Sequence, residues 1–77
     1  MADYISSIDQ LLDEMIKQQE TKVLKIAHEI LPNTTPEDLR NPQDFSELIN
    51  DTKFNYEDGI LTGYLSVKAA VKNLINL

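Results

Sequence analysis

The sequence contains no cysteine, no tryptophan, two glycines and a single histidine, His28. Without cysteine there is no disulfide scaffold, and one histidine cannot form the two- or three-histidine sites that hold transition metals. A chain of 77 residues buries only about 60% of its unfolded surface. A core of this size seldom provides more than ~3–5 kcal/mol of stability. We therefore expect association with another chain to complete the fold.

Long apolar runs and a basic N-terminal region are also missing. The first residues, Met1 to Asp9, carry two acids and no base. This pattern argues against a signal peptide, and no apolar segment approaches the length of a membrane span. We predict no membrane association and a cytoplasmic location.

Positive charge is scarce. Seven Lys and Arg stand against thirteen Asp and Glu, which leaves a net charge of −6. A field of this sign repels phosphate backbones, so we predict no nucleic-acid binding.

Two long segments follow helical periodicity, with apolar residues recurring at spacings of three and four. The three prolines, Pro32, Pro36 and Pro42, all lie between these segments. We predict helices over residues 4–31 and 56–76, and no strand, because no segment alternates with period two. The predicted stripes comprise Met1, Tyr4, Ile5, Ile8, Leu11, Leu12, Met15, Val23, Ile26 and Ile30 in the first helix, and Tyr56, Ile60, Tyr64, Val67, Val71, Leu74 and Ile75 in the last.

The first helix is predicted to continue through Gln19–Lys22. Gln19 and Lys22 interrupt the apolar stripe there, although its phase survives. A kink or a wetter layer is the alternative at this point. Beyond it, Leu24, Ala27 and Leu31 add a second apolar face, which the connector is expected to cover.

Three helix starts are indicated in the middle of the chain. Thr35-Pro36 and Asn41-Pro42 each place a capping side chain before a proline and an Asp three residues after the cap, and Asn55 repeats the pattern without proline. Proline suits the first helical position, and the cap and acid can satisfy free N–H groups at a helix start. These motifs predict short helices over residues 36–40 and 42–50 and start the last helix after Asn55.

The predicted fold is thus a single all-α domain over residues 1–77. Two long antiparallel amphipathic helices are joined by a connector of two short helices, which covers the second half of the first long helix. A hairpin of this kind has one good layer of core. We expect self-association into a four-helix assembly, or docking on a larger helical partner.

A ridge of small residues in the last helix allows another helix to approach closely. Its four members are Gly59, Gly63, Ser66 and Ala70. The approach can be made within the chain, between subunits, or by a ligand. With apolar residues of the first helix, the predicted interface is Ile8, Leu12, Met15, Gly59, Gly63, Ser66 and Ala70.

The first helix is also polarised in charge. Its acids, Asp3, Asp9, Asp13 and Glu14, precede its bases, Lys17, Lys22 and Lys25. This order complements the helix dipole. It would also make two antiparallel copies of the helix complementary to each other.

Two groups of polar residues could carry chemistry. Asp44, Glu47 and Asp51 share one side of the second short helix, where they form a solvated face, an acidic docking surface or, least favoured, a site for a hard cation. His28 is expected to stabilise the end of the first helix, whereas catalysis would require His28, Tyr56 and an acid in one pocket. We predict no catalytic residue, no metal and no cofactor.

The function most consistent with these features is a non-enzymatic protein–protein interaction or oligomerisation module, either a homodimer or a binder of a helical partner. The alternative is an acidic regulatory protein that captures a basic partner or mimics nucleic acid.

Overall fold

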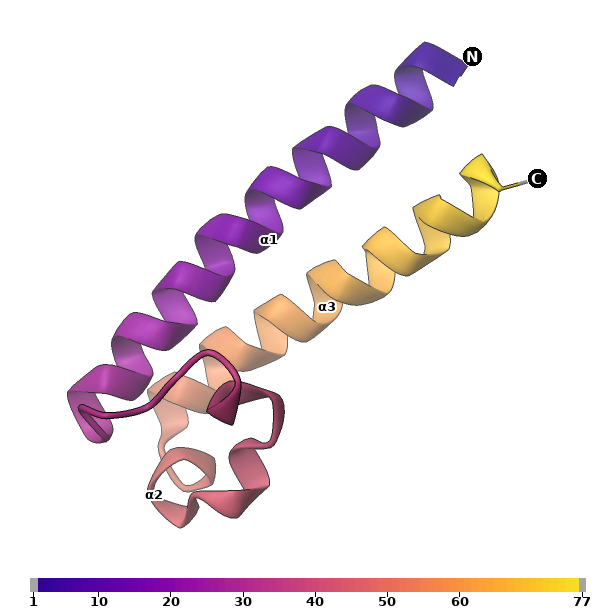
Figure 1. Cartoon of the computed structure of the whole chain (residues 1–77). Coiled ribbons are helices and arrows are strands. Elements are labelled where there is room, and N and C mark those ends of the chain that lie inside the picture. Colours follow the sequence, from indigo (N-terminus) through magenta and orange to yellow (C-terminus); the bar gives the residue numbers. More distant parts are fainter. Residues whose placement is uncertain (1, 77) are drawn as a thin grey trace.

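The structure is a computed structural model that describes residues 2–76, with side chains from residue 4 onward. Within this range the elements are α1 (Ala2–Ile30), two 3₁₀ turns η1 (Asp38–Arg40) and η2 (Pro42–Asp44), a short α2 (Ser46–Ile49) and α3 (Thr52–Ile75), with no strand. The long helices run antiparallel side by side, and the described ends of the chain lie far from the connector (Figure 1). The predicted all-α hairpin is confirmed. The predicted place of Met1 in the apolar stripe lies outside the described residues.

Helix α1 is continuous through Gln19–Lys22, as predicted. The interrupting residues are satisfied by α3: Gln19 Nε2 donates to the Glu57 carbonyl oxygen over 2.8 Å, and Lys22 Nζ lies 3.1 Å from Glu57 Oε2. Buried polar groups are tolerated when they are hydrogen-bonded or paired. A polar layer therefore crosses the hairpin here without a kink.

The connector begins with the predicted capping box. Asp38 N donates to Thr35 Oγ1 over 3.2 Å, and Thr35 N donates to Asp38 Oδ2 over 3.0 Å. The helix that follows is a single 3₁₀ turn, η1. The reciprocal bonds between Thr35 and Asp38 are thus confirmed, but the N-cap position of η1 is Glu37, without a side-chain cap, and the helix is shorter than the predicted 36–40.

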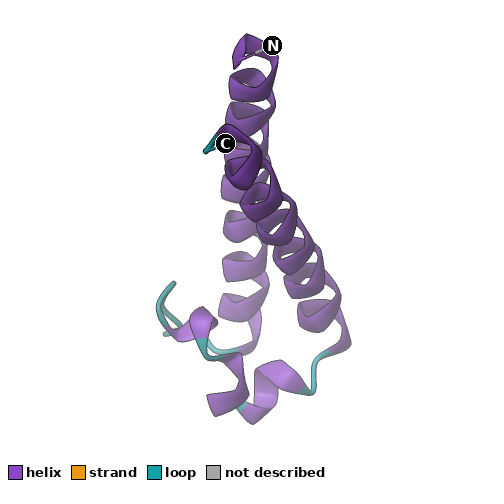
Figure 2. Ribbon diagram, turned by 90° about the vertical axis from the view of Figure 1, so that its right-hand side faces the viewer, coloured by secondary structure: helices purple, strands orange, loops and turns teal. Residues whose placement is uncertain are grey.

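The prediction of one helix over 42–50 is wrong. Phe45 is extended, with φ −124° and ψ 98°, and separates η2 from α2. Asn41 makes no side-chain cap to η2, so its predicted capping role is also wrong. The break lets Phe45 and Leu48 both reach the core, where Leu48 is completely buried. Figure 2 shows these short elements folded beneath one end of the long helices.

Helix α3 begins at Thr52, and its cap is Asp51, not Asn55. Asp51 Oδ1 accepts a hydrogen bond of 2.7 Å from Phe54 N. Asn55 instead donates through Nδ2 to the Ile49 carbonyl oxygen over 2.7 Å, which ties α3 to the end of α2. The earlier start places Phe54 in the first turn of α3, facing the core.

The core lies at the connector end of the hairpin. It consists of Val23, Ile26, Ala27, Leu48 and Phe54, with the connector packed over the second half of α1 as predicted. The rest of the molecule is a long pair of helices. The extents are 45 × 19 × 18 Å and the radius of gyration is 14.5 Å, against about 11.5 Å for a compact chain of this length.

Candidate interaction surface

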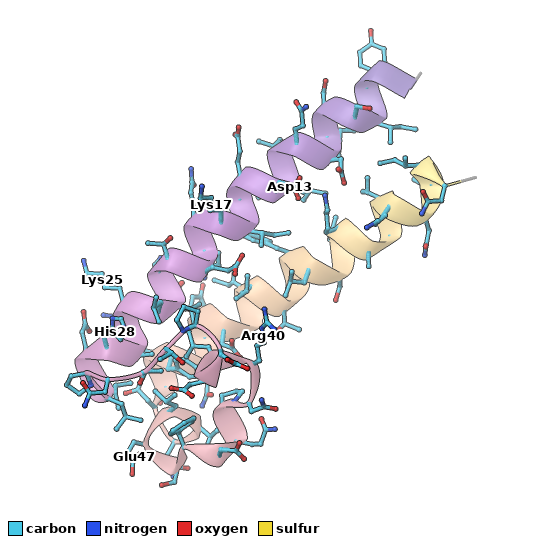
Figure 3. The ribbon with its side chains drawn as sticks, in the orientation of Figure 1. Asp13, Lys17, Lys25, His28, Arg40 and Glu47 are labelled. Carbon is cyan, nitrogen blue, oxygen red and sulfur yellow. The ribbon has the colours of Figure 1, made fainter. Side chains whose placement is uncertain are left out.

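Helix α3 turns two of its charged residues, Glu57 and Lys68, toward α1. Glu57 is buried against α1, and Lys68 Nζ lies 2.6 Å from both Asp9 Oδ1 and Asp13 Oδ1 of α1. Figure 3 shows Asp13 directed into the space between the long helices. The hydrogen bonds that the Lys68 ammonium donates to Asp13 and, with a smaller effect, to Asp9 raise its pKa, against a smaller opposing effect of burial. Ionic contacts therefore hold the two long helices together toward the end of the hairpin that lies away from the connector.

The second half of α3 has few charged residues. From Gly59 to the C-terminus the only charged residues are Lys68 and Lys72. Val67 is 50% exposed and Leu74 57% exposed. The apolar stripe predicted for this helix is therefore only partly buried: Ile60, Tyr64 and Val71 are half-buried, and the other members are exposed. Phe54 and Glu57 are the buried residues of α3.

The first half of α1 also exposes apolar residues. Leu12 and Ile16 are buried, but Ile8 and Leu11 are about half exposed and Tyr4 is largely exposed. Met15 is half-buried. Surface helices usually turn polar residues outward, so the exposed apolar residues on both long helices require an explanation.

Helical geometry places the two exposed apolar sets on the same side of the hairpin. Each residue turns a helix by about 100°. On α1 the set lies roughly 80° to one side of the buried line through Leu12, Ile16 and Val23. On α3 it lies roughly 90° from the inward line through Glu57 and Lys68, in the same rotational sense. Because the helices are antiparallel, offsets in the same rotational direction place both sets on the same side of the hairpin. We call this surface the open face; it comprises Tyr4, Ile8, Leu11, Met15, Ile60, Val67, Val71 and Leu74.

The connector covers the opposite side. A groove of about 750 Å³ lies between the connector and the long helices. Its walls include Leu24 of α1, Leu65 of α3 and Arg40 of the connector, and Figure 3 shows Arg40 in front of α3. Burial raises the pKa of the Asp58 carboxyl, which lines the same groove. The connector therefore shields one face of the hairpin, and no described residue of the chain covers the open face.

The residues predicted as an interface are divided by the structure. Ile8 and Met15 lie on the open face, whereas Leu12 is buried inside the hairpin. Gly59 and Gly63 would have nothing within 4 Å of an added Cβ atom, so close packing within the chain does not explain them. The small-residue ridge, completed by exposed Ser66 and Ala70, borders the open face along the outer side of α3.

The predicted acidic surface is dispersed. Asp51 caps α3, while Asp44 and Glu47 are exposed; Glu47 lies at the far end of the connector (Figure 3). Across the described range, no three His, Cys, Asp or Glu side chains are grouped to hold a metal ion. The structure thus brings no metal-binding set together from Asp44, Glu47 and Asp51.

His28 has a local structural partner. Its Nε2 atom is hydrogen-bonded to the carbonyl oxygen of Thr34, just beyond the end of α1. Tyr56 is exposed on α3, and neither residue lines the larger groove. The structure does not gather the combination that catalysis would need.

The open face was predicted only in part from the sequence. Ile8 and Met15 were assigned to the interface, whereas Tyr4, Leu11, Val67 and Leu74 were placed in the apolar stripes without a partner. The available signal was the scarcity of charge in the second half of α3, where Lys68 and Lys72 are the only charged residues.

None of the helices described is long and apolar enough to cross a membrane. Comparison of the chain with protein-family models, curated proteins and solved structures finds no significant match.

Proposed function

We propose that this chain is a non-enzymatic interaction module that binds a helical surface through its open face. The observation that carries the proposal is the inverted charge pattern of α3. Glu57 and Lys68 of α3 pair with Lys22, Asp9 and Asp13 of α1, while the apolar Val67 and Leu74 of the same helix are exposed.

The energetic argument is the cost of leaving this face in water. Burying apolar surface contributes roughly 25 cal/mol per Å², and contiguous exposed apolar patches of several hundred Å² mark interaction sites in soluble proteins. Val67 and Leu74 are exposed on the open face together with Leu11 and Ile8 of α1. A partner helix laid along the face would remove them from water together.

The test uses two residues of α3 that are equally exposed but lie on opposite faces. Val67 is 50% exposed on the open face, and Leu65 is 49% exposed on the connector side. A photo-crosslinking phenylalanine analogue is introduced at one position or the other in cells that produce the chain. Irradiation should give adducts of defined mass from position 67, and mass spectrometry identifies the protein attached.

Position 65 is the matched control, because it lies on the same helix, two residues away, and has the same exposed fraction. Circular dichroism of the purified variants establishes that both retain the helical fold. Adducts from position 65 alone, or no adducts from either position in folded protein, would show that the open face is not a binding surface.

A further inference from the structure

We infer that the open face is filled by a second copy of this chain, related by a two-fold axis parallel to the helices, so that two hairpins form a four-helix bundle with both connectors at one end. The inference rests on the proposed function and adds the identity and orientation of the partner.

The chain exposes more surface than a compact monomer of its mass. The chain exposes 5711 Å², whereas a folded monomer of 8.8 kDa exposes about 4,800 Å². The excess is about 900 Å², close to the ~800 Å² that each partner buries in a stable interface of standard size. Covering one face of the hairpin would bring the area to that of an ordinary folded protein.

The shape of the chain leads to the same assembly. Its radius of gyration of 14.5 Å is close to the value of about 15 Å expected for a compact protein with twice as many residues. The hairpin is one layer of helices, 45 Å long. A second hairpin on the open face supplies the second layer that a helical bundle requires.

Charge permits two copies to meet on this face in particular. Each chain carries a net charge of −6, so two copies repel at long range. The open face itself contains no charged residue. A two-fold contact places the same patch on both sides, and an uncharged patch can face itself without like-charge contact.

The ion pairs already present select the orientation. Two antiparallel copies of α1 could pair the acidic half of one with the basic half of the other, but Asp9 and Asp13 are held by Lys68 and Lys22 is held by Glu57. These groups are satisfied within the chain. Antiparallel pairing of α1 with its own copy therefore loses part of its charge complementarity.

The distribution of apolar residues favours the same orientation. They occupy the first half of α1 and continue to the end of α3, so they concentrate where the chain ends lie. An axis parallel to the helices places the apolar half of one copy against the apolar half of the other. Each α1 then lies against α3 of the other copy. Because the Asp9 and Asp13 contacts place Leu11 level with Lys68, Leu11 of one copy meets Val67 of the other.

The absence of cysteine makes this geometry directly measurable. Leu11→Cys and Val67→Cys are prepared separately, one chain carrying a mass tag, and the two are mixed and oxidised. Both positions are about half exposed, so the substitutions leave the interior unchanged. The mixture should give the mixed disulfide at least several-fold above either homodimer, and untagged unmodified protein should sediment at twice 8.8 kDa.

Controls separate the possible failures. Gln10→Cys lies on α1 next to Leu11 but off the open face, and should not cross-link to Val67→Cys. Ile8→Cys with Val71→Cys is a second pair for the case in which one of the first variants does not fold.

A homodimer of Leu11→Cys exceeding the mixed disulfide would overturn the orientation. A folded monomer at high micromolar concentration would overturn the second copy as occupant. The proposed function would still stand in that case if position 67 is photo-crosslinked to a different protein.

Discussion

Lys22 and Glu57 form an ion pair across the two long helices in which the exposures of the partners differ widely. The Lys22 side chain is 59% exposed and that of Glu57 is 6% exposed, with 3.1 Å between Nζ and Oε2. The carboxylate is therefore the group that folding removes from water, and the ammonium compensates it from the surface.

This asymmetry predicts unequal effects of removing either partner. Lys22→Met should destabilise the chain by about 1–3 kcal/mol, because it leaves a buried carboxylate without its counter-charge. Glu57→Leu should change stability by less than about 1 kcal/mol, because Lys22 can return to water. Urea unfolding at one fixed protein concentration measures both. An equal or larger loss for Glu57→Leu would contradict the interpretation, and the double variant should recover most of the loss caused by Lys22→Met.

The contacts of Lys68 predict a dependence on high pH. Asp13 and Asp9 raise its pKa above the ordinary value of 10.5. A base whose pKa is raised by folding contributes stability that is fully present below its unfolded pKa and is lost as pH rises through its folded pKa. The melting temperature should thus exceed that of Lys68→Met at pH 9, and the difference should shrink above pH 10.5. Lys72→Met, at an exposed position on the same helix, is the control and should show no such convergence.

The cap of α3 gives a prediction that distinguishes the structure from the sequence pattern. Asp51→Ala should cost about 0.5–2 kcal/mol, because Phe54 N loses its acceptor at the start of the helix. Asn41→Ala should cost less than about 0.5 kcal/mol, since Asn41 caps nothing through its side chain. Chemical denaturation of the two variants ranks them. The reverse order would restore the Asn-Pro motif as a helix start.

The small-residue ridge predicts opposite effects on folding and assembly. Gly63→Leu meets nothing within the chain and replaces a poor helix former by a good one, so helicity should be kept or increased. In the proposed assembly the added side chain blocks the approach of the second copy, and the dissociation constant should rise at least tenfold. Sedimentation equilibrium and circular dichroism measure these two quantities. Unchanged assembly would remove the ridge from the interface.

The sequence predicted the helices better than the direction in which they face. Periodicity identified α1 and α3 because a helical stripe needs only spacing. Periodicity could not decide which side of α3 packs inward. Glu57 and Lys68 are charged residues, which are expected at the surface, but both face α1 in the fold. Their direction depends on Asp9, Asp13 and Lys22, which are distant in sequence, and only the folded hairpin brings them together.

The connector was predictable where only one residue could provide the capping hydrogen bonds. Thr35 and Asp38 satisfy each other as the pattern indicates. Asn55 failed because Asp51 offers an earlier cap, and the earlier start buries Phe54. Burial of an aromatic side chain outweighs the choice between two similar caps. The candidate surface was partly predicted through Ile8, Met15 and Gly63, while Leu12 was assigned to the wrong side.

The two ends of the hairpin are held by different forces, and this divides the molecule into zones that respond to different conditions. The connector end is closed by Phe54, Leu48 and Val23, whose burial salt hardly affects. The far end is closed by Lys68 between two carboxylates, which salt screens. Amide hydrogen exchange along α1 should therefore form a gradient that steepens with ionic strength, with the first turns fraying while the last turns stay protected. The concentration of salt thus acts on the rigidity of the same region that presents the open face.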